Sequence, residues 1–269
     1  MILRDVIHRF DGFLLDQFGV LHDGAQLLPG AVEALVAIRA TGKPVVLVTN
    51  SAKPAAANEA RLARMGIGRD LYTALVSSGE TARAGIADGS FGPCFRPGCQ
   101  VHVIGRAGEN YGLDDLGITP AGLDEAEALL ILGSDAPEVS LEHYTERLAP
   151  AVRRGLSALC ANPDLLMLTT SGPQPAPGAI ARAYEEMGGT VFYAGKPHPA
   201  IYRQALRPLG VRSSARVLAV GDSPQHDVAG AADAGLATAL VRTGLSAGHS
   251  EAALRQAGPI APDIVLDGL

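Results

Sequence analysis

Short apolar runs alternate with amphipathic segments along the chain, and this alternation restricts the fold more than any other feature. Segments such as 31–42 and 200–210 are apolar at helical spacing and end in glycine, which is typical of helices. Strand–helix alternation predicts an α/β fold, with a parallel, doubly wound sheet covered by helices. The runs expected to form buried strands are FLL (13–15), VVLV (45–48), ALV (74–76), VHVI (101–104), ALLIL (128–132), LSALC (156–160), VFY (191–193), RVLAV (216–220), TALV (238–241) and DIVL (263–266).

Length, charge and cysteine content limit the number of domains, the kinds of partner and the cellular location. With 269 residues the chain can form one large domain or two modest ones, each with its own core. The formal net charge is −6 and no cluster of Lys and Arg occurs, which argues against a nucleic-acid partner. No apolar run reaches membrane-spanning length, and the first twelve residues are too charged for a signal peptide. The cysteines, Cys94, Cys99 and Cys160, fit neither a disulfide framework nor a zinc site, so we expect reduced thiols and a cytoplasmic protein.

Two stretches are rich in glycine and proline. The first, GSFGPCFRPGC at 89–99, is expected to be a crossing point between domains. The second, TTSGPQPAPG at 169–178, is expected to be a loop rather than a linker.

Polar side chains follow several of the expected strands, where parallel sheets bind ligands. Each has an ordinary interpretation when taken alone, as a turn residue, a helix cap or a surface lysine. Together they suggest a site, because acids at adjacent strand ends repel one another unless a hard cation or a lysine neutralises them. Such a group would suit Mg²⁺ and a phosphoryl group. The residues concerned are Asp16, Thr49, Asn50, Lys196, Asp222 and Asp227.

These residues occur in four motifs whose order resembles that of the haloacid dehalogenase (HAD) superfamily. The motifs are DQFGV, VLVTN, GKP and GDSPQHD. Each string is weak evidence by itself, but four in this order and at these separations are specific. VSSGETA, VHVIGRAG, CANPDL and PGAIARAYEEMGG also resemble subclass IIA, the subgroup that contains nucleotide, sugar-phosphate and pyridoxal-phosphate phosphatases.

The resemblance implies a Rossmann-like core with an inserted α/β cap of the C2 type. Because the four motifs are split around the middle of the chain, the core is expected at 1–88 and 189–269, with the cap at 89–188. It also implies a Mg²⁺-dependent phosphatase that hydrolyses a small phosphorylated metabolite, such as a sugar phosphate or nucleotide. Large caps often supply dimer contacts in this subgroup, so a homodimer is expected.

Transferred residue by residue, the resemblance assigns roles to the strand-end residues. It makes Asp16 the nucleophile that forms an aspartyl-phosphate and Lys196 the group that neutralises charge in the transition state. Mg²⁺ would be held by Asp16, the backbone carbonyl of Phe18, and Asp222, with Asp227 acting through water or orienting the others. The residues expected to bind the phosphate or the leaving group are Thr49, Asn50, Asn162 and Asp164.

Phe18 departs from the phosphatase pattern, which has a second aspartate at this position. That aspartate protonates the leaving oxygen and later deprotonates water, and such help contributes about 10²–10⁴ in rate. His22 or Asp23 could replace it; otherwise the protein is a slow phosphatase or a binder of phosphorylated ligands. A haloacid dehalogenase, which carries an aromatic residue here, is a further alternative, although the complete fourth motif argues against it. A dinucleotide-binding oxidoreductase is the competing fold-level hypothesis, but no glycine-rich nucleotide loop is present.

Overall fold

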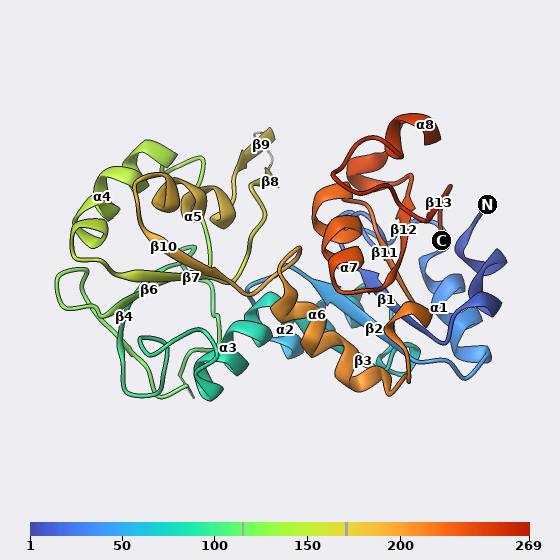
Figure 1. Ribbon diagram of the computed structural model, residues 1–269, viewed down its shortest axis with the longest axis horizontal. Coiled ribbons are helices and arrows are strands. Elements are labelled where there is room, and N and C mark those ends of the chain that lie inside the picture. Colours follow the sequence, from blue (N-terminus) through green and yellow to red (C-terminus); the bar gives the residue numbers. More distant parts are fainter. Residues whose placement is uncertain (115, 170–171) are drawn as a thin grey trace. The chain divides into compact units, whose positions relative to one another are not determined.

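The chain forms two compact units, one from its two ends and one from its middle. In the computed structural model, which describes residues 1–114, 116–169 and 172–269, the first unit comprises Met1–Thr49, Ala55–Val76 and Lys196–Leu269. The second comprises Asn50–Pro54 and Ser77–Gly195. Each unit has a parallel sheet with its own helices (Figure 1).

The sheet of the first unit follows the order β13-β12-β11-β1-β2-β3. β1 pairs in parallel with β2 and with β11, although about two hundred residues of sequence separate β1 from β11. Numbered along the chain, this is the order 3-2-1-4-5-6 of doubly wound folds. The strands are β1 (Gly12–Asp16), β2 (Val45–Thr49), β3 (Ala74–Ser77), β11 (Val217–Gly221), β12 (Ala237–Val241) and β13 (Ile264–Leu266).

Helices cover both faces of this sheet, because successive residues of a strand point to opposite sides. Phe13 and Leu15 of β1 pack in the core formed with α1 (Ala31–Ala40) and α2 (Ala55–Met65). Leu14 packs in the opposite core, with α6 (Pro199–Leu206) and α7 (Gly230–Asp233). A short helix, α8 (Glu251–Leu254), packs through Leu254 against Leu240 and Val265.

The second unit has a five-stranded sheet in the order β10-β7-β6-β4-β5. Its helices α4 (Leu141–Arg153) and α5 (Pro177–Glu186) cover one face, where Tyr144, Leu148 and Tyr184 are buried against the strands. Helix α3 (Ser78–Asp88) precedes the first strand. The strands are β4 (Gln100–Ile104), β5 (Thr119–Pro120), β6 (Ala128–Ile131), β7 (Ser157–Cys160) and β10 (Thr190–Tyr193).

All ten strands predicted from apolar runs are confirmed. The expected loop at 169–178 is wrong for its central part, because β8 (Leu166–Thr169) and β9 (Gly172–Pro175) form an antiparallel hairpin. Turn-forming residues obscured the second strand, since proline is tolerated in a strand that has a free edge. Residues 170 and 171 of that stretch lie outside the described residues.

The division of the chain differs from the expected boundaries. Helix α3, expected in the core, belongs to the second unit, and so does β10. The turn-rich stretch 89–99 lies inside the second unit, where Phe95 and Cys99 are fully buried. Glycine and proline there mark a folded turn region with its own apolar contacts, including the edge-to-face packing of Phe95 on Phe192.

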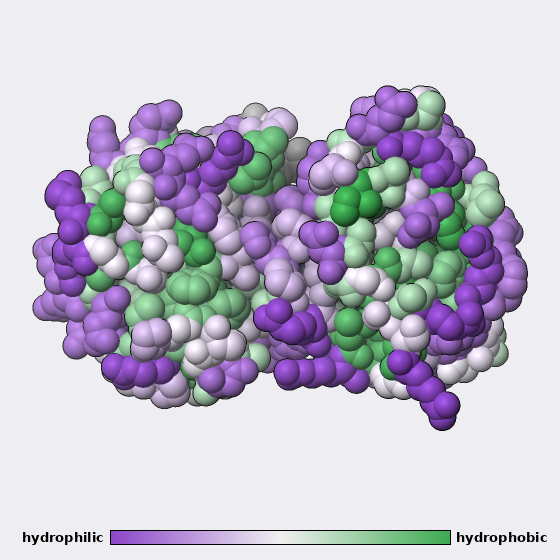
Figure 2. Space-filling view, viewed as in Figure 1, coloured by the Kyte–Doolittle hydropathy of each residue, from purple (hydrophilic) through white to green (hydrophobic). Residues whose placement is uncertain are grey.

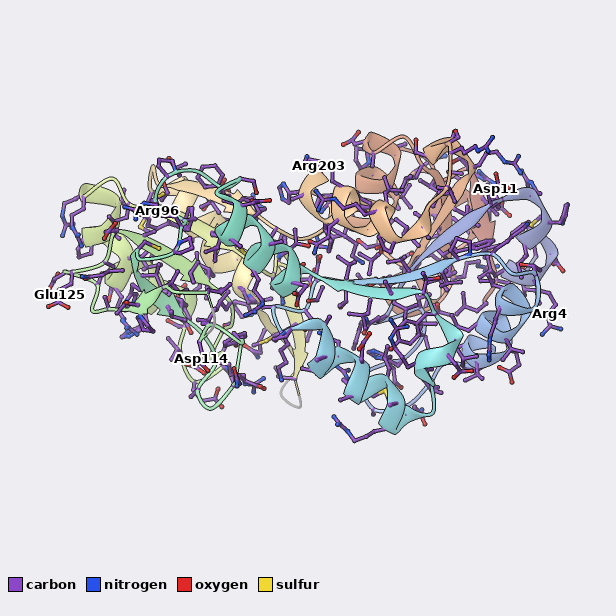
Figure 3. The ribbon with its side chains drawn as sticks, turned by 90° about the horizontal axis from the view of Figure 1, so that it is seen from below. Arg4, Asp11, Arg96, Asp114, Glu125 and Arg203 are labelled. Carbon is purple, nitrogen blue, oxygen red and sulfur yellow. The ribbon has the colours of Figure 1, made fainter. Side chains whose placement is uncertain are left out.

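Charged and polar side chains are spread over the visible face of each unit, with small apolar areas between them (Figure 2). Arg4, Asp11 and Arg203 extend outward from the first unit, and Arg96, Asp114 and Glu125 from the second (Figure 3). Among the described residues, no helix combines the length and the apolar character needed to cross a membrane.

Candidate functional site

Asp16 and Asp222 lie close together because neighbouring strands of the first unit carry them. Asp16 is the last residue of β1, and Asp222 follows the last residue of β11, while Leu15 pairs with Val220. The strand order reverses between β1 and β11, since the chain first adds β2 and β3 on one side and later adds β11 to β13 on the other. Open parallel sheets bind ligands outside the carboxyl ends of the strands at such a reversal.

A third carboxylate completes a cluster that fits a divalent metal. One oxygen from each of Asp16, Asp222 and Asp227 lies within 4.8 Å of the others. Burial raises the pKa of Asp222 to about 7, and the neighbouring charge of Asp227 adds to the shift. Carboxylate oxygens so placed are the donors that Mg²⁺ and Ca²⁺ prefer. The backbone carbonyl of Phe18 accepts no hydrogen bond from the described residues, so it is available as a further oxygen ligand.

Lys196 is the cation of the cluster. Its Nζ lies 2.7 Å from Oδ1 of Asp16 and 2.6 Å from Oδ1 of Asp227, and the side chain is only 5% exposed. Burial by itself would lower the pKa of Lys196, but the charges of Asp16 and Asp227 raise it above its usual value. Burial also raises the pKa of Asp16, and Lys196 opposes that change. With two carboxylates as acceptors, we assign the proton of this group to Lys196.

A loop from the C-terminal part of the chain fixes Asp222. The amide of Leu245 donates to Oδ2 of Asp222 at 2.7 Å, and Oγ of Ser246 donates to its backbone carbonyl at 2.7 Å. Oγ1 of Thr243 donates to the carbonyl of Gly19 at 2.6 Å, which joins this loop to the residues after β1. A Cβ at Gly19, where φ is +80°, would lie 2.0 Å from Oδ2 of Asp222, so the position requires glycine.

Asp227 is held by its own local contacts. It lies in η6 (Pro224–Ala229), a single π-helical turn of the kind often found at functional sites. The amide of Ser223 donates to Oδ2 of Asp227 at 3.0 Å, which leaves Oδ1 for Lys196. The hydroxyl of Tyr202, from α6, donates to the carbonyl of His226 at 2.9 Å and supports the same turn.

The other expected substrate-binding residues divide between the units. Thr49 is the last residue of β2 in the first unit. Asn50, Asn162 and Asp164 belong to the second unit, where Nδ2 of Asn50 donates to Oδ1 of Asp164 at 2.8 Å. Oδ1 of Asn162 accepts the backbone amide of Asp164 at 3.0 Å, so these three residues are joined by hydrogen bonds through Asp164.

The surroundings of Phe18 show what the expected substitutes for the missing acid do. The Phe18 side chain is 40% exposed, and its ring meets that of buried His22 edge to face. Nδ1 of His22 accepts the amide of Gly24 at 3.1 Å, and burial lowers the pKa of His22 to about 4, so the ring is neutral at pH 7. Oδ1 of Asp23 accepts two backbone amides of its own turn. Among the described residues, neither side chain hydrogen-bonds to Asp16 or Lys196.

The structure thus brings together Asp16, Lys196, Asp222 and Asp227, while sequence reasoning missed the residues that support them. Thr243 and Ser246 were missed, although the string TGLS after the expected strand at 238–241 is a polar turn at the same edge of the sheet. No comparable signal marks Tyr202, which acts through its hydroxyl from the interior of a helix.

Comparison with known proteins gives consistent matches along the whole chain. Residues 13–119 match the family described as haloacid dehalogenase-like hydrolase, and residues 193–269 match the family described as HAD-hydrolase-like. Human chronophin is 31% identical over 258 residues, which cover 91% of this chain and 85% of chronophin. A haloacid dehalogenase-like hydrolase from Brucella suis 1330 superposes with a TM-score of 0.85 and 31% identity, covering 100% of this chain and 98% of that one.

A further solved structure carries a metal. The glycerol phosphate phosphatase Rv1692 of Mycobacterium tuberculosis, in complex with magnesium, matches with a TM-score of 0.76 and 26% identity, covering 98% of this chain and 77% of that one. The same phosphatase is also known in complex with calcium.

Proposed function

This chain belongs to the haloacid dehalogenase-like hydrolases, and from that premise we propose that it is a Mg²⁺-dependent phosphatase acting on a small phosphate monoester. The observation that carries the proposal is the buried group of Asp16, Lys196, Asp222 and Asp227. Three carboxylates and one ammonium carry a formal charge of −2, which a divalent cation neutralises. When bound, the metal supplies electrostatic stabilisation of the phosphoryl oxygens.

The proposed reaction has two displacements at phosphorus. In the first, a carboxylate oxygen of Asp16 bonds to phosphorus while the ester P–O bond breaks, and the departing oxygen takes a proton from solvent or the site. In the second, water attacks phosphorus of the aspartyl-phosphate, the acyl P–O bond breaks, and inorganic phosphate leaves. Lys196, 2.7 Å from Asp16, neutralises charge on the nucleophile and on the phosphoryl oxygens.

Roles for the remaining residues rest mainly on the family resemblance. We propose that Thr49 and Asn50 bind the phosphate, and that Asn162 and Asp164 help to recognise the leaving group. The contact between Asn50 and Asp164 supports a shared role for that pair. The homodimer and the cytoplasmic location expected from the sequence stay predictions, and analytical ultracentrifugation tests the first.

A second candidate function follows from Phe18. With a half-exposed phenyl ring at this position and a neutral, buried His22 beside it, neither residue can act as a general acid at pH 7. The protein would then bind a phosphorylated metabolite and hydrolyse it slowly or not at all. The three-carboxylate cluster disfavours dehalogenation, because halide departure needs no metal site. Membership of the hydrolase family rules out the dinucleotide-binding oxidoreductase.

One screen separates these functions. Purified protein is incubated with a panel of phosphate monoesters in Mg²⁺, in parallel with EDTA and with 2-chloropropionate. A phosphatase releases inorganic phosphate only in the presence of metal. A pure binder releases none but is stabilised against heat by one of the esters, and chloride release without metal would show a dehalogenase.

A further inference from the structure

The second unit has a strand-order reversal of its own. Its sheet places β5 on one side of β4 and all later strands on the other, so the order reverses between β4 and β6. Numbered within this unit, the order is 2-1-3-4-5, and Ile104 pairs with Ile131 across the reversal. Sheets of this order bind ligands outside the carboxyl ends of these two strands.

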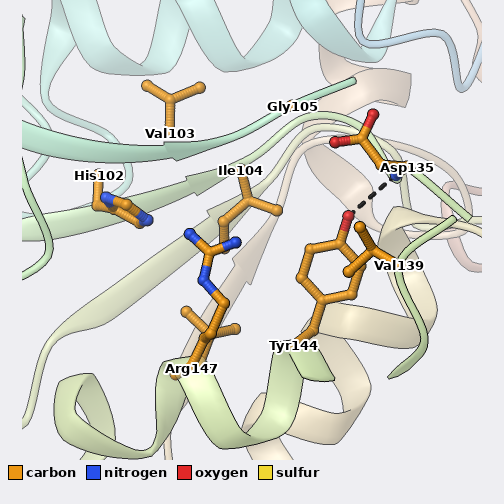
Figure 4. A pocket seen from close by; sticks show the side chains of 9 residues that line it. His102, Val103, Ile104, Gly105, Asp135, Val139, Tyr144 and Arg147 are labelled. Atoms are coloured by element: carbon orange, nitrogen blue, oxygen red, sulfur yellow. Dashed lines mark hydrogen bonds between the residues drawn. The ribbon is translucent and has the colours of Figure 1, made fainter. Parts of the chain in front are cut away.

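A cavity of about 230 Å³ lies at this reversal (Figure 4). It is bounded by the C-terminal half of β4, by Asp135 just beyond β6, and by α4. His102 and Ile104 leave β4 on the side of α4, whereas Val103 points to the opposite side. The described residues between β4 and β5, 105–114 and 116–118, contain no helix, so no crossover helix of that connection packs over this part of β4.

The cavity carries two opposite charges whose hydrogen-bonding capacity is not used up within the described residues. Arg147 is exposed on α4, its guanidinium extends toward His102 and Ile104, and it forms no ion pair or hydrogen bond with any described residue. Oδ1 of Asp135 accepts the amide of Ala107 at 2.9 Å, and its second oxygen has no hydrogen-bond partner in the described part of the chain. The Tyr144 hydroxyl accepts the amide of Asp135 at 2.9 Å, which leaves its own proton for a ligand.

We propose that this cavity binds an amino acid with an aliphatic side chain. Its carboxylate would pair with Arg147 and its ammonium with Asp135, because planar guanidinium and carboxylate groups form the strongest charged hydrogen bonds. The aliphatic group would contact Ile104, Val139 and Leu148, which form the apolar wall. The volume is below the roughly 300–1,000 Å³ of pockets for drug-sized ligands, so a nucleotide does not fit. The proposal does not depend on phosphatase activity.

Three probes dissect the two charges in the wild-type, full-length protein. L-leucine carries both charges, 4-methylpentanoate lacks the ammonium, and 3-methylbutylamine lacks the carboxylate. In ¹H–¹⁵N NMR titrations, L-leucine should shift the amide signals of Gly105 and Tyr144 at millimolar concentration or below. Each half-ligand should bind more weakly by up to about fivefold, since each lacks one charged contact and the pair is partly exposed to solvent.

Two variants should both weaken L-leucine, and each should leave a different half-ligand unaffected. Arg147→Gln should weaken L-leucine by up to about fivefold and leave 3-methylbutylamine unchanged. Asp135→Asn should weaken L-leucine but leave 4-methylpentanoate unchanged. Arg153→Gln is the matched control, because Arg153 is an exposed arginine of the same helix outside the cavity. If Asp135→Asn fails to fold, Arg147→Gln with the two half-ligands still decides the question, since the substitution removes no ion pair or hydrogen bond within the described residues.

Three results would overturn the proposal. The first is the absence of shifts with both L-leucine and L-valine at millimolar concentration. The second is equal binding of 4-methylpentanoate and L-leucine to the wild type. The third is a loss of L-leucine binding in Arg153→Gln as large as in Arg147→Gln.

Discussion

The two sheets use the same topological position in opposite ways. Both reverse their strand order beside their first strand, at β1 and β11 in the first unit and at β4 and β6 in the second. At the first reversal Asp16, Asp222 and Lys196 are largely buried and in contact, directly or through Asp227. At the second a cavity remains, and the exposed guanidinium of Arg147 has no partner among the described residues.

The difference shows that the strand order determines where a site can form, and that the side chains there determine what the site can bind or catalyse. Buried carboxylates in mutual contact need an external cation, because desolvation and repulsion both disfavour their ionised forms. Charges that are exposed, like Arg147, or half-buried, like Asp135, keep much of their hydration and remain able to bind a small ligand. The first arrangement suits phosphoryl transfer and the second suits reversible binding.

The largest effect should come from Asp16→Asn, which tests whether the first reversal performs chemistry. An amide cannot form the acyl-phosphate, so metal-dependent phosphate release should fall to the level of buffer alone. Colorimetric phosphate assays with p-nitrophenyl phosphate measure this. Asp11→Asn is the control, since Asp11 is an exposed acid of the same unit that pairs with Arg216. Full activity in Asp16→Asn would place the chemistry elsewhere.

Phe18→Asp should change the rate in the other direction. Restoring a carboxylate two residues after Asp16 should accelerate turnover by at most about 10²–10⁴, the contribution of general acid–base catalysis. The gain should be largest for alkyl phosphates, whose leaving oxygens need a proton, and small for aryl phosphates. Turnover numbers for glycerol phosphate and p-nitrophenyl phosphate give the comparison.

His22→Ala and Asp23→Ala serve as companions to this variant. If either one abolishes wild-type turnover, that residue already transfers the proton. In that case Phe18→Asp should leave the rate unchanged even with Mg²⁺ binding intact, because the proton transfer is already supplied.

Ser246→Ala tests how far the carboxylates depend on their supporting loop. It removes the 2.7 Å hydrogen bond to the Asp222 carbonyl, and loss of a supporting contact of this kind typically weakens metal binding by about 10–100-fold. Isothermal titration calorimetry with Mg²⁺ measures the change. Ser250→Ala is the control: it removes the side-chain cap of α8, which costs about 1 kcal/mol of stability, yet it should leave Mg²⁺ affinity unaltered. Equal affinities in both variants would contradict the role of Ser246.

The smallest effect concerns Cys160, the last residue of β7 in the second unit. Burial raises the pKa of its thiol to about 12, so the unfolded thiol, with an ordinary pKa near 9, ionises first as pH rises. Stability should therefore fall between about pH 9 and pH 12, by about 1 kcal/mol between pH 9 and pH 10.

Urea unfolding at pH 8 and pH 10 measures this loss. Cys160→Ala should show a smaller decline than the wild type, whereas Cys94→Ala, at a half-buried position, should decline like the wild type. The result would sharpen the comparison of the two sheets: β7 of the second unit ends in a buried neutral thiol, whereas β1 of the first unit ends in a carboxylic acid.

Much of the fold could be predicted because its strands are short, apolar and bounded by turns. Three strands were missed: Thr119–Pro120, Leu166–Thr169 and Gly172–Pro175. Proline and glycine argue against the first and the third unless tertiary pairing overrides them, and Leu166–Thr169 belongs to the same two-stranded hairpin as Gly172–Pro175. The crossing points at Ser77 and Lys196 were also missed. They fall at strand ends, where composition does not change, while the turn-rich segment 89–99 is internal to the second unit.

The two candidate sites also differ in how far the sequence alone reveals them. The acids of the first unit stood out because each follows an apolar run, so local sequence and tertiary position agree. Their catalytic roles remain predictions. Nothing local marks Arg147, Asp135 and Tyr144, because only the packing of α4 beside β4 and β6 assembles them.

The pairing of β1 with β11 has a consequence for how the protein is made. The ribosome completes Gly12–Asp16 about 200 residues before Val217–Gly221, which at about 5–20 residues per second is a delay of about 10–40 s. During that interval one edge of an apolar strand has no partner, although its other edge can already pair with β2. Thr243 and Gly19, joined in the finished protein, are 224 residues apart in synthesis. The nascent chain therefore carries Asp16, the proposed nucleophile, long before Asp222 and Asp227, the proposed metal ligands, and the proposed site is complete only after these later residues have been made.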